Sequence, residues 1–174
     1  PCSGTSLIHP HSQLIALEII PKYIRDKEAN AESYFQGHQS CLLCDIISYE
    51  SQQVNRVIFE SDEFLVFVPF FAEVPYEIWL VSKKHNSDFV ELGDTEKRDM
   101  AVSMKKILSK LSARLGDPDY NYIIHSASRN GCGSKALHWY LQIRPRIVTP
   151  AGFEFGSGVS INPSLPENNA EILR

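Results

Sequence analysis

Three strand-like segments followed by one long helical pattern constrain the fold more than any other feature. The segments VNRVIFES, EFLVFVPF and YEIWLVSK (54–61, 63–70 and 76–83) are rich in β-branched and aromatic residues and are separated by turn residues. Between residues 94 and 115, apolar residues recur three and four positions apart, as on one face of a helix. These segments predict an antiparallel meander packed by one long helix, in the α+β class.

The flanking segments predict the remaining elements. Asp94 or Thr95 is the expected N-cap of the long helix, and Gly116 is its expected C-cap. YNYIIHSA (120–127) and ALHWYLQIRPR (136–146) predict two more strands. CLLCDIISYE predicts a cysteine knuckle running into a short helix, and a short C-terminal helix is expected to begin at Pro166.

Two segments show no regular pattern. The stretch 21–40 is polar and lacks apolar periodicity, so it predicts an irregular connector, and the glycines of AGFEFGSGVSINP predict turns. A domain boundary is expected near Gln36. Residues 1–35 would then belong to a preceding half-domain, and residues 36–174 would form a second domain.

Composition excludes several classes of protein. The chain has 174 residues, 43% of them hydrophobic, and a formal net charge of −4, which suits a compact domain and argues against a non-specific nucleic-acid binder. It has no apolar run of membrane-spanning length, and its first residues lack the features of a signal peptide. A cytoplasmic protein is therefore expected.

The segment SLIHPHSQLIAL contains two histidines and a glutamine at alternating positions. In a strand, His9, His11 and Gln13 would lie on one face. Pro10 cannot donate to a sheet ladder, which favours an edge strand or one open to a ligand. The alternative is a surface strand with two solvated histidines, and this motif alone does not distinguish them.

The same spacing occurs a second time. In ALHWYLQIRPR, His138, Tyr140 and Gln142 repeat the pattern with a phenol in place of the middle imidazole. This suggests a duplication in which the later copy lost one chemical group. The chemistry would then belong to His11, and the positions of His9 and His138 would serve a shared purpose, for which metal binding is the natural candidate.

A four-ligand metal site can be assembled around the second copy. Two thiolates and two imidazoles make a closed tetrahedral zinc site, and the candidates are Cys41, Cys44, His85 and His138. The alternative is that the cysteines are only buried small side chains. His125 is a rival ligand, and His38, close to the CxxC pair, is a weaker one.

Taken together, these residues resemble a known family. GTSLIHPHSQ resembles the active-site motif of galactose-1-phosphate uridylyltransferases, G-x-S-x-x-H-P-H-x-Q, members of the histidine-triad superfamily that contain two such halves. CLLCDII, PYEIWLVSKKH, DPDYNYIIHSA, HWYLQIRPR and AGFEFGSGVSINPSLPE resemble the C-terminal half, and most resemble the branch that includes ADP-glucose phosphorylase. The family's first half is absent, so we expect the chain to be part of a longer protein.

The resemblance implies roles for individual residues. His11 would be the nucleophile that accepts a nucleotide from a nucleotide sugar, with Gln13 and Ser6 hydrogen-bonded to the phosphoryl oxygens. Phe153, Glu154 and Asn162 would fall in the sugar-contacting segment. The resemblance also implies structural zinc at the four Cys and His candidates above, a second metal role for His9 that lacks its companions, and a homodimer.

Three functions remain open on the sequence. The first is a ping-pong nucleotidyltransferase that uses a UDP- or ADP-hexose and a sugar 1-phosphate or inorganic phosphate. The second is a zinc-stabilised nucleotide-binding domain without turnover. The third is a histidine-triad nucleotide hydrolase, against which Gln13 argues because those hydrolases usually carry a third histidine at that position.

Overall fold

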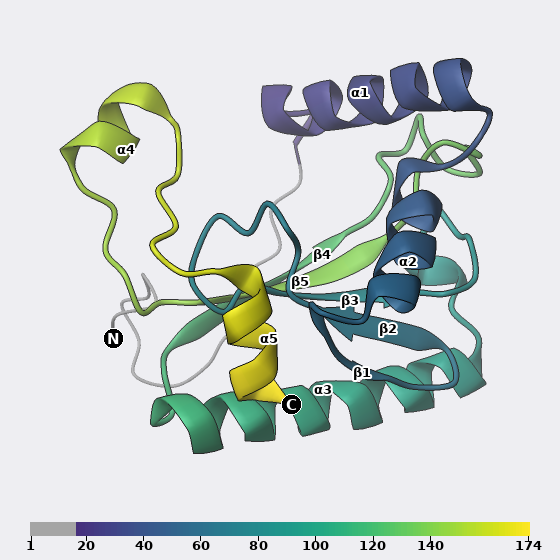
Figure 1. The fold of residues 1–174 in the computed structure, drawn as a ribbon. Coiled ribbons are helices and arrows are strands. Elements are labelled where there is room, and N and C mark those ends of the chain that lie inside the picture. The colour runs from purple at the N-terminus through teal and green to yellow at the C-terminus, as the bar shows by residue number, and fades with distance from the viewer. Residues whose placement is uncertain (1–16) are drawn as a thin grey trace.

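The computed structural model of the protein describes residues 17–174, and the predictions for Ser6, His9, His11 and Gln13 lie outside them. Within the described part, one antiparallel sheet has the strand order β1-β2-β3-β5-β4 (Figure 1). Its strands are β1 Val57–Glu60, β2 Phe64–Phe67, β3 Ile78–Ser82, β4 Tyr120–His125 and β5 Tyr140–Pro145. The predicted meander is β1-β2-β3, and the α+β class is confirmed.

Helices cover both faces of this sheet. These helices are α1 Lys22–His38, α2 Leu42–Gln53, α3 Asp94–Leu115 and α5 Pro166–Leu173; the described residues also form α4 Gly152–Ser157 and a short 3-10 turn at Phe89–Glu91. Figure 1 shows α3 and α5 on one side of the sheet and α1 and α2 on the other. Among residues 17–174, no helix is both long enough and apolar enough to cross a bilayer.

Side chains alternate between the two faces along the central strands and so contribute to two hydrophobic cores. Phe64 and Val66 of β2 pack with Ile107 and Leu111 of α3 in the larger core, whereas Leu65 of β2 lies in the smaller core that α2 covers. Successive strand residues point to opposite faces, and β2 and β3 are buried on both. Their near-continuous apolar runs reflect this two-sided burial.

The long helix was predicted with its correct ends but the wrong cap. Its N-cap is Gly93, not Asp94 or Thr95, and Glu96 Oε2 accepts a hydrogen bond of 2.8 Å from the backbone N–H of Gly93. Gly116 ends the helix with φ of 72°, as predicted, because glycine adopts the left-handed conformation without a Cβ penalty.

The predicted connector at 21–40 is wrong, since most of it forms α1. The helix has no buried residue, which explains why it shows no apolar face in the sequence. Contacts with distant residues hold it instead: Glu28 accepts hydrogen bonds from Ser128, and Glu32 accepts one of 2.6 Å from the Ser134 hydroxyl. The helix passes through the boundary expected near residue 36, and the domain division stays a prediction.

The prediction of turns in the glycine-rich segment 151–163 was only partly correct. Residues 152–157 form the short helix α4 on an arm that projects from the body of the molecule (Figure 1). The arm returns to the body through Asn162, whose amide donates a 2.9 Å hydrogen bond to the carbonyl of Ala72. Gly152 and Gly156 therefore lie within a helix and not in turns, and Gly158 is the C-cap of that helix.

Candidate functional site

The four predicted metal ligands come from three separate parts of the chain. Cys41 is the N-cap of α2 and Cys44 lies in its first turn. His85 lies shortly after β3, and His138 lies two residues before β5. Because β3 and β5 are antiparallel neighbours, with Val81 opposite Tyr140, the end of one strand lies beside the start of the other. The sheet register therefore brings both histidines to the N-terminal end of α2.

The donor atoms of these residues lie close enough to bind one ion. All four lie within 4.8 Å of one another, and Cys44 Sγ is 3.3 Å from His85 Nδ1 and 3.5 Å from His138 Nδ1. In a tetrahedral zinc site, S–Zn and N–Zn bonds of ordinary length place sulfur and nitrogen about 3.5 Å apart. The Cys2His2 group could thus bind a metal such as zinc with little movement.

The environment favours the thiolate that a metal needs. A hydrogen bond from the Cys44 thiol, assisted by His138, lowers the pKa of Cys41 despite its burial. The same hydrogen bond raises the pKa of Cys44. The N-terminus of α2 adds a favourable dipole at this position.

The two rival histidines have other partners. His125 Nε2 lies 2.8 Å from Gln142 Oε1, and its ring stacks on Tyr140 at 4.4 Å. The exposed His38 stacks on Tyr34 at 4.1 Å. Neither belongs to the Cys and His cluster in the described part of the chain, and the histidines that the structure brings to the two thiols are His85 and His138.

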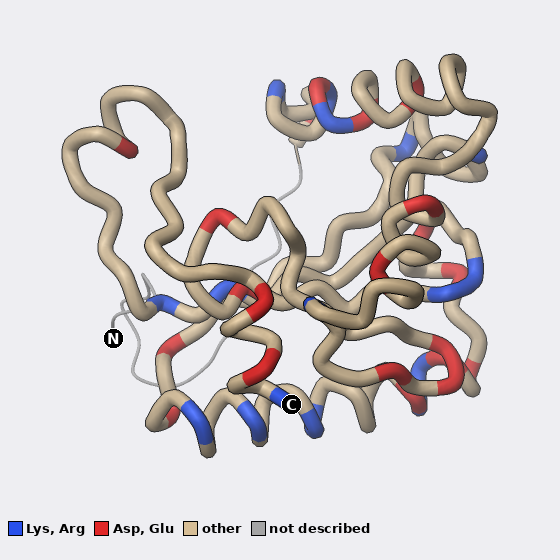
Figure 2. The backbone as a smooth tube through the Cα atoms, viewed as in Figure 1, with Lys and Arg blue, Asp and Glu red and all other residues tan. Residues whose placement is uncertain are grey.

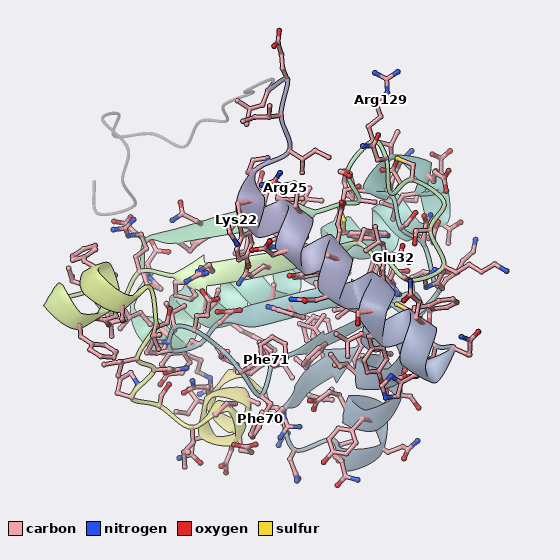
Figure 3. All side chains as sticks on the ribbon, turned by 90° about the horizontal axis from the view of Figure 1, so that it is seen from above. Lys22, Arg25, Glu32, Phe70, Phe71 and Arg129 are labelled. Carbon is pink, nitrogen blue, oxygen red and sulfur yellow. The ribbon has the colours of Figure 1, made fainter. Side chains whose placement is uncertain are left out.

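A cavity of about 650 Å³ adjoins the metal cluster, between α1 and the sheet. Its floor includes His138, Tyr140 and Gln142, which are the three positions of the second motif copy. Its roof is α1, which lies across the strands when the molecule is seen from above (Figure 3). We refer to it as the α1 cavity.

A buried carboxyl group organises the floor of the α1 cavity. Glu77 is 1% exposed, and its Oε1 accepts hydrogen bonds of 2.8 Å from Trp79 Nε1 and 2.7 Å from Gln142 Nε2. Its Oε2 accepts a third, of 3.0 Å, from the backbone N–H of Glu73. Sequence reasoning missed Glu77, because only the tertiary structure brings it to Gln142.

The predicted sugar-contacting residues lie on the projecting arm, away from the sheet. The Phe153 side chain is 58% exposed. Glu154 Oε2 accepts a 2.8 Å hydrogen bond from the backbone N–H of Ala151, and it is the only charged residue between 147 and 165 (Figure 2). Asn162 makes its hydrogen bonds within the chain, to Ala72 and Ser164. Their role in binding sugar stays a prediction.

Comparison with known proteins identifies the family. The family described as "Galactose-1-phosphate uridyl transferase, C-terminal domain" matches residues 27–150. The chain belongs to this family. The match runs from within α1 to the base of the arm and includes all four metal-ligand candidates.

Two curated relatives support the family assignment. ADP-glucose phosphorylase of Arabidopsis thaliana is 37% identical over 99% of this chain and 48% of its own length. Galactose-1-phosphate uridylyltransferase of Thermotoga maritima is 29% identical over 98% of this chain and 56% of its own length. The chain therefore spans about half the length of the curated relatives that it matches.

Solved structures agree with this assignment. A crystal structure of Arabidopsis thaliana ADP-glucose phosphorylase with bound ADP-glucose has a TM-score of 0.80 and 34% identity, over 91% of this chain and 50% of that one. A zinc-bound histidine triad family protein from Mycobacterium smegmatis has a TM-score of 0.53 at 20% identity, over 78% of this chain and 91% of that one. The second likeness confirms the expected histidine-triad-like fold of this galactose-1-phosphate uridyl transferase family member.

Proposed function

We propose that the chain is part of a nucleotidyltransferase that acts on a nucleotide sugar through a covalent nucleotidyl-histidine. The observation that carries the proposal is membership of the galactose-1-phosphate uridyl transferase family in a chain that also has the HPH motif at 9–11. The 37% identity to ADP-glucose phosphorylase, a relative solved with ADP-glucose, favours an ADP-hexose over a UDP-hexose. The cytoplasmic location stays a prediction.

In the proposed reaction, an imidazole nitrogen of His11 attacks the α-phosphorus of the nucleotide sugar. The bond from that phosphorus to the bridging oxygen breaks, and sugar 1-phosphate leaves. A phosphate oxygen of the acceptor, either a sugar 1-phosphate or inorganic phosphate, then attacks, and the phosphorus–nitrogen bond breaks to free His11. Neutral imidazole is a competent nucleophile near pH 7, and donors such as Gln13 and Ser6 would stabilise the charge on the phosphoryl oxygens.

The metal in this proposal is structural zinc. Bound by Cys41, Cys44, His85 and His138, zinc would join the start of α2 to the adjoining ends of β3 and β5. A closed site of four protein ligands leaves no position for substrate, and such sites stabilise folds. His9, which the resemblance implies as a ligand of another zinc, is proposed to need residues outside this chain.

The arm carries the proposed contact with sugar across a homodimer. Phe153 and Phe155 are 58% and 78% exposed, on a segment that has almost no charge (Figure 2). Exposed aromatic side chains of this kind are typical of binding surfaces. We propose that Phe153, Glu154 and Asn162 approach the hexose bound to a second copy of the chain.

Intact mass measurement tests the proposal. The protein is incubated separately with ADP-glucose and UDP-glucose, beside the variant His11→Ala and the control His38→Ala, which changes an exposed histidine outside the metal cluster. An AMP-sized or UMP-sized adduct is expected in the wild type and in His38→Ala and not in His11→Ala. An adduct that persists in His11→Ala would refute the role of His11. No adduct with either donor, in folded and metal-loaded protein, would favour a binding domain or a hydrolase.

A further inference from the structure

The α1 cavity has the size and lining of a ligand site. Its volume of about 650 Å³ lies within the range of roughly 300–1,000 Å³ that small-molecule sites occupy. Trp79, Phe71, Ile46 and Ile123 contribute apolar surface, and a few polar groups converge among them. The proposed transfer reaction uses none of these residues.

Lys27 is the cation at the roof of the α1 cavity, whose lining also includes the carboxylates of Asp26, Glu28, Glu73 and Glu77. Its Nζ donates a 2.7 Å hydrogen bond to the Tyr140 hydroxyl and lies 4.3 Å from the centre of the Tyr140 ring. A tyrosine phenol is ordinarily neutral near pH 7, so this partner carries no charge. Burial lowers the pKa of Lys27 to about 8. The partly buried cation therefore rests on a neutral hydrogen-bond partner.

Neighbouring carboxyl groups have other partners. Both Glu28 oxygens accept hydrogen bonds from Ser128, and Glu73 forms an ion pair of 2.6 Å with Arg144. Among residues 17–174, no carboxylate forms an ion pair with Lys27. Since an unpaired charge is costly to bury, an anionic group beside Lys27 would gain more than it would at an exposed lysine.

A histidine on the floor of the cavity presents a hydrogen-bond acceptor, because its neighbours determine its tautomer. Gln142 must donate through Nε2 to Glu77, so its Oε1 faces His125, and His125 must donate from Nε2. His125 Nδ1 therefore carries no proton and can accept a hydrogen bond. Because burial and the nearby Lys27 charge lower the pKa of His125 to about 4, this neutral form dominates near pH 7.

We propose that the α1 cavity is a second ligand site, which binds a small phosphate monoester with an uncharged organic body, such as a nucleoside monophosphate, with its phosphate beside Lys27. The cavity has apolar walls and enough volume for a ligand much larger than an inorganic ion. The second motif copy places Tyr140 where the first has His11, and a protonated phenol is a poor nucleophile, so the site binds without group transfer. This inference does not depend on the chemistry proposed for His11.

Competitive labelling tests the site directly. Trace acetylation with acetic anhydride is followed by peptide mass spectrometry, while AMP, UMP or inorganic phosphate is titrated. We expect AMP or UMP to slow acetylation of Lys27 by about tenfold at saturation and to leave Lys22 unchanged. Lys22 is the matched control because it lies at the exposed N-terminal end of the same helix, paired with Asp26 (Figure 3).

Variants separate this site from the proposed transferase site. Lys27→Met should weaken AMP or UMP binding, measured by calorimetry, by about tenfold, whereas Lys22→Met should not. Lys27→Arg, which keeps the charge, should retain most of the affinity and guards against a folding defect in Lys27→Met. Protection of Lys27 should persist in His11→Ala.

Four results would overturn the inference: unchanged acetylation of Lys27 with both nucleotides, equal protection by inorganic phosphate alone, equal affinity in Lys27→Met, or loss of protection in His11→Ala. The last would place the nucleotide at the first motif. Loss of the covalent adduct, by contrast, would count against the proposed function and leave this site untouched.

Discussion

Replacing Cys44 by alanine should release the bound metal and destabilise the whole domain. Cys44 Sγ is the donor nearest to both imidazoles, at 3.3 Å and 3.5 Å, so its loss leaves three ligands and an open tetrahedron. The intact site closes one loop of 41 residues, from Cys44 to His85, and a second of 94 − 41 = 53 residues, from His85 to His138. A metal bound there would thus act as a cross-link between distant segments.

Loop closure sets the expected magnitude. By the chain-entropy relation for cross-links, closing either loop restricts the unfolded state by about 4 kcal/mol at 25 °C. The loss should therefore lower the free energy of unfolding by at least about 4 kcal/mol, the value for one cross-link, and by up to about 8 kcal/mol when release of the metal removes both. With an unfolding entropy of about 2.1 cal/mol/K per residue, the smaller value lowers the melting temperature of this 174-residue chain by about 11 °C.

Calorimetry and metal analysis measure the effect. The wild type should contain about one zinc per chain, and chelation should lower its melting temperature as far as Cys44→Ala does. Cys132→Ala is the control, because it removes an exposed thiol outside the cluster. The reasoning fails if purified wild-type protein contains no metal and chelator leaves its melting temperature unchanged. It also fails if both alanine variants melt at the same temperature.

Three further perturbations test the packing and the electrostatics. Arg56→Ala should lower the free energy of unfolding by about 3–5 kcal/mol in urea titrations, because it leaves Glu50, 3% exposed, without its 2.8 Å ion-pair partner; a loss below about 1 kcal/mol would contradict this. Leu111→Ala in the larger core should cost about 2–5 kcal/mol in the same assay, against less than about 0.5 kcal/mol for exposed Val102→Ala on the same helix. The pKa of His125 is lowered to about 4 in the fold, so the unfolded state binds more protons than the folded state between pH 6.5 and 4. The free energy of unfolding should therefore decrease as the pH is lowered from 6.5 to 4. After a discount for solvent screening, the expected loss is about 1–2 kcal/mol. His125→Gln should flatten that part of the profile, and an unchanged slope would show that another group is responsible.

Much of the fold could be read from local pattern. The helix at 94–115 has a continuous apolar stripe and a glycine stop, and each strand of the meander lies between turn residues. The metal ligands were predicted as candidates for a similar reason, since CxxC spacing and the duplicated histidine are visible in one dimension. The choice of His85 and His138 over His125 and His38 was not, because it depends on the register of β3 against β5.

The failures share one physical cause. The helix α1 carries no buried residue and holds its position through Glu28 and Glu32, whose partners lie 100 and 102 residues away. No local periodicity records such contacts. The same holds for Lys27 and Glu77, which become significant only where α1 covers the second motif copy.

The sequence by itself determined the α+β class, the family resemblance and the chemical types of the metal ligands, because these follow from short-range spacing and residue identity. Only the tertiary structure decided which histidines meet the two thiols and where the cavity lies. It also decided that a polar segment becomes a helix. Each of these depends on strand pairing and on contacts between residues far apart in the chain, which local pattern does not encode.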